Sequence, residues 1–160
     1  MEQHDRIHIE LPAKSEYVSI ARLSVSGIAN RLGFSYDDIE DIKIAVAEAC
    51  TNVVEHAYSE DGFISLACYI YEDRIKIIVA DQGKSFNIDE VESRLGPVDS
   101  KKPVGDLKEG GLGLFLITTL MDKVEINEDN GVMLVMTKYL YESGVEESVD
   151  GVSSLQSEQG

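Results

Sequence analysis

Two side chains that can act together in phosphate chemistry lie one helical turn apart in the middle of the chain. Glu48 and Asn52 are four residues apart in a segment with helical periodicity, so they share one face of the expected helix, and His56 extends the same polar stripe. A neutral Asn oxygen can hold Mg²⁺ without competing with phosphate, and a Glu one turn away can accept a proton from an attacking hydroxyl. The spacing alone also fits a solvated polar helix face, so the sequence downstream has to decide.

A carboxylate followed by a glycine ends an apolar run further along the chain. Asp81 comes directly after residues 75–80, and Gly83 follows two positions later. A carboxylate at a strand end can accept a hydrogen bond from an exocyclic amine, which distinguishes adenine from guanine, and Gly83 leaves room for a flat base. The competing interpretation is an Asp-x-Gly turn, which is a common use of this pair of residues.

A third group of residues is rich in glycine. Gly110, Gly111, Leu112 and Gly113 open an apolar segment that reads as a helix to about residue 121. A helix N-terminus presents free backbone N–H groups and the positive end of the helix dipole, both of which suit phosphate. Glycine lets the backbone approach a ligand closely. A glycine cluster by itself also fits a flexible joint.

Between residues 84 and 109, before the glycine cluster, the apolar residues show neither helical nor strand periodicity. A structureless segment of this length inside a compact domain is usually functional, and we interpret it as a lid over a triphosphate. Lys101, Lys102 and Lys108 can offset phosphate charge in such a lid. The six acidic residues in the same segment also fit a solvated loop.

Helices and strands that could position these residues follow from periodicity and turn signals. We expect strands over residues 6–11, 63–71, 74–80, 124–127 and 132–140. We expect helices over residues 13–32, from about 36 to 57, and 110–121. The second helix has a capping signal in Ser35 and Asp38 and an apolar stripe made of Ile42, Ala45, Val46, Ala49 and Val53. The pattern predicts an α+β fold.

Composition limits the classes of protein that fit. The chain has 160 residues, enough for one domain with a sizeable core, and its formal net charge of −16 argues against a nucleic-acid surface. Cys50 and Cys68 lie in apolar periodic segments, which favours buried thiols over a disulfide. No signal peptide and no membrane-spanning run is recognised, so we expect a cytoplasmic protein. Residues 141–160 are acidic, and we expect them to be a disordered tail outside a domain of residues 1–140.

Taken together, the three groups resemble the N box and the two glycine boxes of the GHKL ATPase and kinase superfamily, in order and in spacing, over about residues 6–140. The resemblance is stronger for the small bacterial anti-sigma serine kinases within that superfamily. It implies the Bergerat ATP-binding fold, a two-layer α/β sandwich with a mixed, mostly antiparallel sheet and helices on one face.

By this resemblance, Glu48 is the catalytic base and Asn52 the Mg²⁺ ligand, while Asp81 and Gly83 read the adenine. The lid and second glycine box would bind ATP through Lys108, Gly110, Gly111, Leu112 and Gly113. Arg22, exposed on the first helix, would engage a sigma factor. Three positions depart from the family pattern, namely Ser85, Glu109 and Val132.

The resemblance also implies a function. The protein would sequester an alternative, stress-response sigma factor of the sigma-B type and, with ATP and Mg²⁺, phosphorylate a serine of an anti-anti-sigma protein. It would act as a homodimer. The alternatives are a partner-binding module without catalysis, against which Glu48 speaks, and the ATPase part of a histidine kinase, against which the lack of a phosphoacceptor helix speaks.

Overall fold

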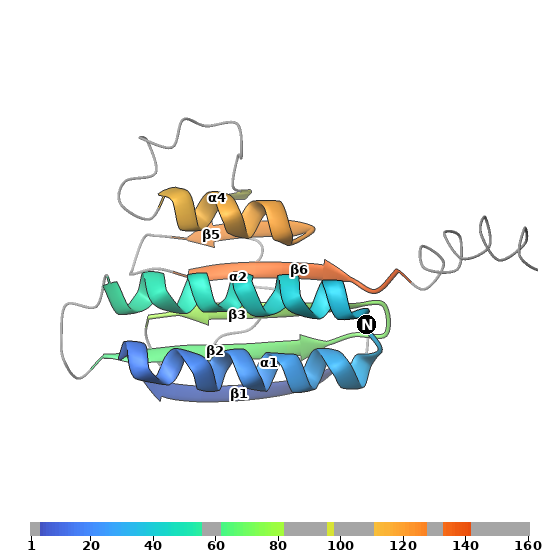
Figure 1. Ribbon diagram of the computed structural model, residues 1–160, viewed down its shortest axis with the longest axis horizontal. Helices are drawn as coiled ribbons and strands as arrows, with labels where there is room; N and C mark the ends of the chain where they lie inside the picture. Colours follow the sequence, from blue (N-terminus) through green and yellow to red (C-terminus); the bar gives the residue numbers. More distant parts are fainter. Residues whose placement is uncertain (1–3, 56–61, 82–95, 98–110, 128–132, 142–160) are drawn as a thin grey trace, which may run out of the picture.

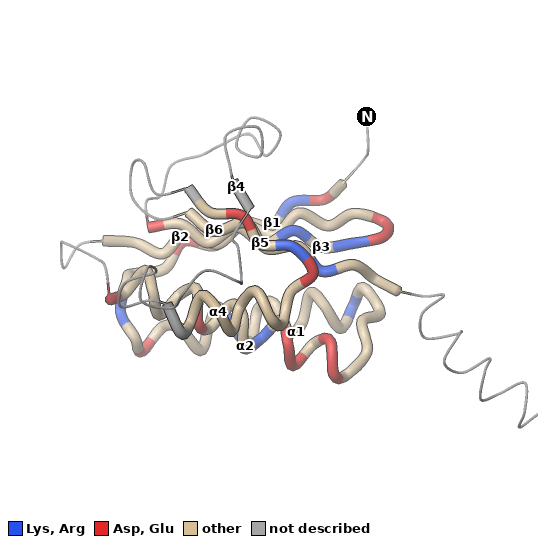
Figure 2. The backbone as a smooth tube through the Cα atoms, turned by 90° about the horizontal axis from the view of Figure 1, so that it is seen from above, with Lys and Arg blue, Asp and Glu red and all other residues tan. Residues whose placement is uncertain are grey.

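Helices and a sheet form two layers in the computed structural model, which describes residues 4–55, 62–81, 96–97, 111–127 and 133–141 (Figure 1). The long helices α1, α2 and α4 all lie on the same face of the sheet, and Figure 2 shows the helices and the strands as two separate layers. This confirms the predicted two-layer α/β sandwich with helices on one face.

The sheet has six strands in the order β1-β2-β3-β6-β5-β4. Their bounds are Asp5–Pro12 for β1, Phe63–Ile70 for β2, Arg74–Ala80 for β3, Gly96–Pro97 for β4, Lys123–Asn127 for β5 and Met133–Tyr139 for β6. Every pairing among these strands is antiparallel, so the described sheet is wholly antiparallel where a mixed one was expected. Strands β2 and β3 form a hairpin, with the Tyr71 N–H donating to the Arg74 carbonyl around Glu72 and Asp73.

The helices begin and end where the local sequence favours it. After a short 3-10 turn over Ser15–Tyr17, α1 spans Val18–Leu32 and ends at Gly33, which adopts the left-handed conformation (φ 95°) that a glycine tolerates. Helix α2 spans Tyr36–Glu55, and the Ser35 hydroxyl accepts the Asp38 N–H at 3.1 Å, as the capping signal predicted. Helix α4 spans Gly111–Leu120.

The main core lies between the helices and the sheet. All five residues of the apolar stripe predicted for α2 are fully buried there. They pack against alternate residues of the central strands, among them Leu66, Ile77, Leu134 and Met136. This packing fixes the face of α2 that meets the sheet, and it therefore fixes the direction of the polar stripe beside it.

Two expectations about individual segments need adjustment. The first helix starts later than residue 13, because residues 15–17 form a 3-10 turn. The proposed lid over residues 84–109 contains the short edge strand β4, which pairs with Glu125 and Ile126 of β5. The rest of that segment and the tail from residue 142 lie outside the described residues. Among the described residues, no helix is both long and apolar enough to cross a membrane.

Candidate nucleotide-binding site

Segments that are far apart in the sequence meet at one end of the molecule. In Figure 1 the second half of α2, the end of β3 and the beginning of α4 all lie at the left-hand end. Helix α4 packs directly on α2 and runs antiparallel to it. The N box, the end of the strand before Asp81 and the start of the glycine-box helix are thus at the same end of the fold.

Glu48 and Asn52 of α2 face the first turn of α4 at close range. A Cβ atom on Gly113 would lie 2.9 Å from Glu48 Oε2 and 3.7 Å from Asn52 Oδ1. Both side chains are half-buried, so they are held by their surroundings while remaining within reach of a ligand. The structure therefore brings together three of the predicted site residues, and glycine at position 113 is what allows the approach.

The end of β3 places Asp81 beside this region. Residues Ile75, Ile77 and Val79 bury one face of β3 under the helices, and Asp81 follows the last strand residue, Ala80, in a half-buried position. A carboxylate at such a strand end is held by a rigid scaffold, which is the condition for reading one edge of a base. Gly83, the second half of this motif, lies outside the described residues.

The start of α4 supplies the helix N-terminus that phosphate would need. Gly111 and Leu112 are its first two residues, and Leu114, Ile117 and the following Met121 bury one side of the segment in the core. The N–H groups of a first helical turn have no partner within the helix and can bind an anion. Lys108 and Gly110, which were also predicted to bind ATP, lie outside the described residues, as does His56.

Arg22 lies on a different helix from the three motifs. It is exposed in the first half of α1, as predicted, so its guanidinium is accessible to a partner. Near it on α1, Ile20 is 42% exposed and Leu23 is 66% exposed. Exposed apolar residues and an exposed Arg on one helix are residue types that occur at protein-binding surfaces.

The two cysteines take no part in this chemistry. Both are free and buried, and burial raises the pKa of Cys50 to about 12 and that of Cys68 to about 12, with the neighbouring Cys50 adding to the effect on Cys68. A thiol with such a pKa stays protonated at neutral pH and is a poor nucleophile. The predicted buried thiols are confirmed.

The residues present fit a magnesium nucleotide. Within the described residues, no group of three or more His, Cys, Asp or Glu side chains could hold a metal ion by itself. Mg²⁺ commonly binds through one or two protein oxygens together with phosphates and water, so a single Asn oxygen beside a phosphate-binding helix start suits it. Because Glu48 and Asn52 lie directly against Gly113, a ligand bound at the N-terminus of α4 would lie next to both side chains.

One residue near α4 was missed by the sequence reasoning. Lys138 of β6 is only 8% exposed, and its Nζ donates a hydrogen bond of 2.6 Å to the carbonyl of Leu120, the last residue of α4. A signal existed, because the alternation Leu134, Met136, Lys138 puts a lysine on the core side of the strand. A buried lysine needs partners, and Lys138 has them on two helices.

Comparison with known proteins agrees with the geometry. Residues 11–138 match the histidine kinase-like ATPase domain family. A serine-protein kinase RsbW from Halalkalibacterium halodurans is 63% identical over 157 residues, covering 98% of this chain and 97% of the relative. A serine-protein kinase RsbW from Bacillus mycoides is 51% identical over 158 residues, covering 98% of this chain and 99% of the relative.

A solved structure supports the fold. The crystal structure of the RsbU and RsbW domains of a Mycobacterium tuberculosis protein aligns with a TM-score of 0.61 at 22% identity, covering 85% of this chain and 32% of that one. With full-length identities of 51–63% to several bacilli proteins of that name, the chain belongs to the RsbW serine-protein kinases, within the histidine kinase-like ATPase domain family.

Proposed function

We propose that this protein transfers the γ-phosphoryl group of ATP to a serine of a small anti-anti-sigma protein and, separately, sequesters an alternative sigma factor of the sigma-B type. The observation that supports the catalytic half is the approach of Gly113 to Glu48 and Asn52, which brings the start of α4 next to the residues that we propose as base and metal ligand. The relatives named serine-protein kinase support the reaction class. A cytoplasmic location follows from the proposed sigma-factor partner.

Each residue has a role in this reaction. Asn52 Oδ1 would hold Mg²⁺, the ion that offsets phosphate charge when bound, and the N-terminal N–H groups of α4 would bind the phosphates. Asp81 would accept a hydrogen bond from the adenine amine. Glu48 would accept the proton of the serine hydroxyl as the bond from serine oxygen to phosphorus forms, the bond from the β-phosphate oxygen to phosphorus breaks, and ADP leaves.

Sigma-factor binding would use a different surface. Arg22 is exposed on α1, outside the three motifs, with the exposed side chains of Ile20 and Leu23 on the same helix. An exposed cation can pair with an acidic group of a partner, and exposed apolar side chains on the same helix can bury apolar area on binding. We also propose a homodimer, as the family resemblance implies, and light scattering coupled to gel filtration would measure its mass.

A two-by-two comparison tests both halves. Glu48→Gln keeps the shape of the side chain and removes the base, so it should bind ATP and sigma factor but transfer little phosphate. Arg22→Glu reverses the charge on α1, so it should phosphorylate normally but lose the sigma factor. Phosphorylation with γ-labelled ATP and pull-down of the sigma factor are the two measurements.

Matched variants on the same helices serve as controls. Glu40→Gln removes a carboxylate from α2 that pairs with Lys43 at 2.9 Å, and Arg31→Glu reverses an exposed charge in the last turn of α1. Both controls should keep both activities. A wild-type phosphorylation rate in Glu48→Gln would refute the catalytic assignment. Full sigma-factor binding by Arg22→Glu would move the binding surface elsewhere, and binding without any phosphorylation by the wild type would support a non-catalytic module.

A further inference from the structure

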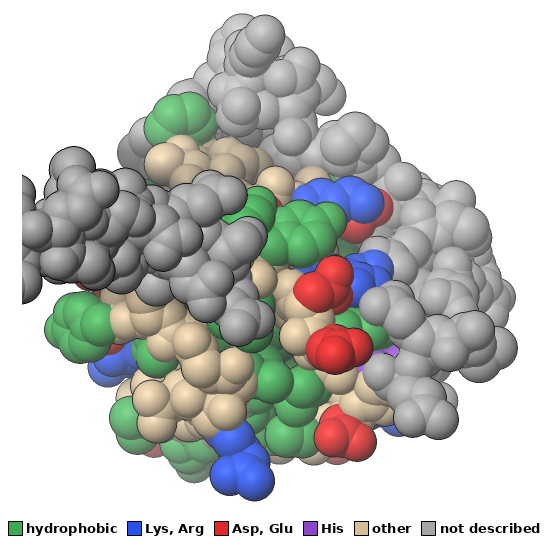
Figure 3. Space-filling model, turned by 90° about the vertical axis from the view of Figure 1, so that its right-hand side faces the viewer, with side chains coloured by type: hydrophobic (Ala, Val, Ile, Leu, Met, Phe, Trp, Pro, Cys, Tyr) green, Lys and Arg blue, Asp and Glu red, His purple; other side chains and the backbone are tan. Residues whose placement is uncertain are grey.

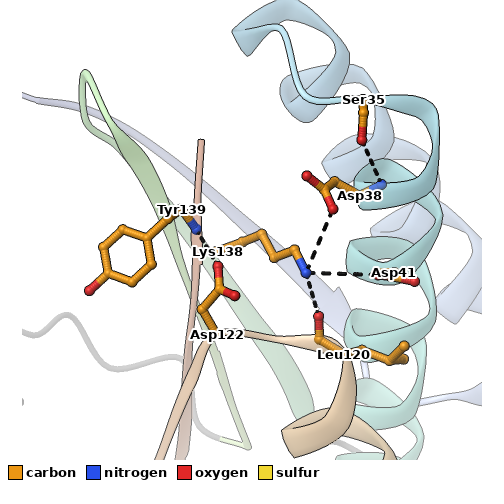
Figure 4. Close-up of polar contacts among 7 residues, drawn as sticks. All are labelled: Ser35, Asp38, Asp41, Leu120, Asp122, Lys138 and Tyr139. Atoms are coloured by element: carbon orange, nitrogen blue, oxygen red, sulfur yellow. Dashed lines mark hydrogen bonds and ion pairs between the residues drawn. The ribbon is translucent and has the colours of Figure 1, made fainter. Parts of the chain in front are cut away.

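A second polar cluster lies at the opposite end of α2 and α4 from the candidate site. Figure 4 shows Lys138 of β6 extending toward both helices. Its Nζ donates to the Leu120 carbonyl at 2.6 Å and lies 3.8 Å from Asp38 Oδ1 and 3.7 Å from Asp41 Oδ2. One buried cation therefore joins the end of α4, the beginning of α2 and strand β6 of the sheet that both helices cover.

The same end of α4 is fastened to β6 by two further hydrogen bonds. The Asp122 N–H donates to the Thr137 carbonyl at 3.0 Å, and Asp122 Oδ2 accepts the Tyr139 N–H at 2.7 Å. Helix α4 itself has a nearly uniform apolar character, with Phe115 46% exposed and Leu116 36% exposed, so hydrophobic burial alone defines its rotation poorly. The polar bonds at its C-terminal end supply the directional constraint that the apolar contacts lack.

The location of the cluster in the fold makes this constraint relevant to the site. Helix α4 has ten residues, a rigid rod of about 15 Å, and its other end carries Gly113 against Glu48. A tilt or slide at Leu120 moves Gly113 relative to Glu48, and because the two residues are so close, a shift of Gly113 changes where the Glu48 carboxylate can lie. Acidic and basic side chains lie on the surface at this end of the molecule (Figure 3). Lys138 itself is only 8% exposed, so its hydrogen bond to the Leu120 carbonyl is less screened by solvent than a contact between surface charges.

We propose that Lys138 is a positioning residue for the nucleotide site, which sets the phosphate-binding end of α4 relative to Glu48 and Asn52 by fixing its opposite end. The effect on ATP affinity rests on the proposed function. The fastening of the C-terminal end of α4 by Lys138 does not depend on it. Lys138 contacts Leu120, Asp38 and Asp41, and it acts on ATP only through the placement of α4.

The principal variant is Lys138→Met, which keeps an unbranched side chain of similar length and removes the donor. Relative to the wild type, amide hydrogen exchange of the apoprotein should speed up in α4 and stay the same in α1, because only α4 has lost the hydrogen bond at its C-terminal end. At a temperature where the variant is fully folded, the ATP dissociation constant measured by calorimetry should rise about three- to tenfold. Binding of the sigma factor should stay at the wild-type level.

Two other substitutions separate positioning from stability. Lys14→Met is the matched control, because Lys14 is an exposed lysine just before the 3-10 turn and lies outside α4 and β6, so its loss should leave ATP affinity unchanged. Asp122→Ala removes the acceptor of the Tyr139 N–H from an exposed position. This variant should fold even if Lys138→Met does not, and it should weaken ATP binding in the same direction.

The outcomes distinguish the inference from the proposed function. If folded Lys138→Met binds ATP as tightly as the wild type, Lys138 is only a structural residue and the inference is wrong. If Lys138→Met does not fold, wild-type affinity in Asp122→Ala would show that fastening this end of α4 does not set the ATP site, which also overturns the inference. If Lys138→Arg, which restores a donor and a positive charge, recovers the affinity lost in Lys138→Met, the positioning role is supported. If the wild type itself does not bind ATP, the proposed function fails, and the hydrogen-exchange comparison still tests the tether.

Discussion

Gly113 of α4 approaches Glu48 of α2 so closely that a methyl group on Gly113 would lie 2.9 Å from Glu48 Oε2. The atom in the way is the tip of a flexible side chain, which can move without disturbing the backbone. A side chain at position 113 would therefore displace the carboxylate that we assign as the base and leave the packing of the two helices largely intact.

Gly113→Ala should consequently impair catalysis more than folding. We expect the phosphorylation rate to fall at least about tenfold, as misplaced catalytic groups commonly cause, while the melting temperature changes little. Gly27→Ala is the control, because no atom lies within 4 Å of a Cβ at that exposed position of α1. The control should gain about 0.5–1 kcal/mol of stability and keep its activity. Equal rates in Gly113→Ala and wild type would show that Glu48 is not displaced or not needed.

Asn52→Ala should abolish binding of magnesium ATP while the fold is retained, and Asn52→Asp should do the same. Alanine removes the metal ligand, and aspartate adds a negative charge next to the phosphates. Calorimetric titration measures the affinity, and circular dichroism checks the fold. Asn30→Ala, at an exposed position of α1, should behave as the wild type. Normal ATP affinity in either Asn52 variant contradicts the role of Asn52.

Asp81→Asn should weaken ATP binding, because one acceptor oxygen is replaced by a donor that faces the adenine amine. The loss should be about 1–3 kcal/mol, the usual range for a hydrogen-bonded group left without its partner. Binding of GTP, measured in parallel, should change less. If Asp81→Asn binds ATP as tightly as the wild type, Asp81 is a turn residue and another group reads the base.

The free energy of unfolding should decrease at alkaline pH. Burial raises the pKa of Cys50 and Cys68 from 9.0 to about 12, so the folded protein keeps both thiols neutral where the unfolded chain would release their protons. The stability that comes from this difference is complete below pH 9 and is lost as the pH rises toward 12. Urea unfolding between these limits should show a shallower pH dependence in Cys50→Ala/Cys68→Ala. An unchanged slope would mean that the thiols do not titrate differently on unfolding.

Removal of residues 142–160 should leave the melting temperature within about 2 °C and the phosphorylation rate unchanged, since this acidic segment has too few apolar residues to offset its ordering entropy. Differential scanning calorimetry and the labelled-ATP assay measure the two quantities. A substantial loss of either one would show that the segment docks on the domain.

The sequence by itself determined those features that depend on neighbours along the chain. The apolar stripe of α2 was predicted residue by residue because apolar residues repeating about every 3.6 positions fall on one face of a helix. All five residues are buried. The bounds of β3, Arg74–Ala80, were predicted in the same way from the local pattern of residues. The residues of the three motifs could be named for the same reason, since their spacing is local.

Only the tertiary structure decided which of these local features meet. Ser35 and Asp38 formed part of the predicted cap, but the carboxylate of Asp38 lies toward Lys138, a residue from the last strand. The 2.9 Å approach at Gly113 depends on the antiparallel packing of α4 on α2. The position of α4 depends in turn on strand β5, which follows it in the chain and pairs with β6. Such contacts join segments far apart in the sequence, and their geometry is set by the whole packed core and by no pattern within either segment.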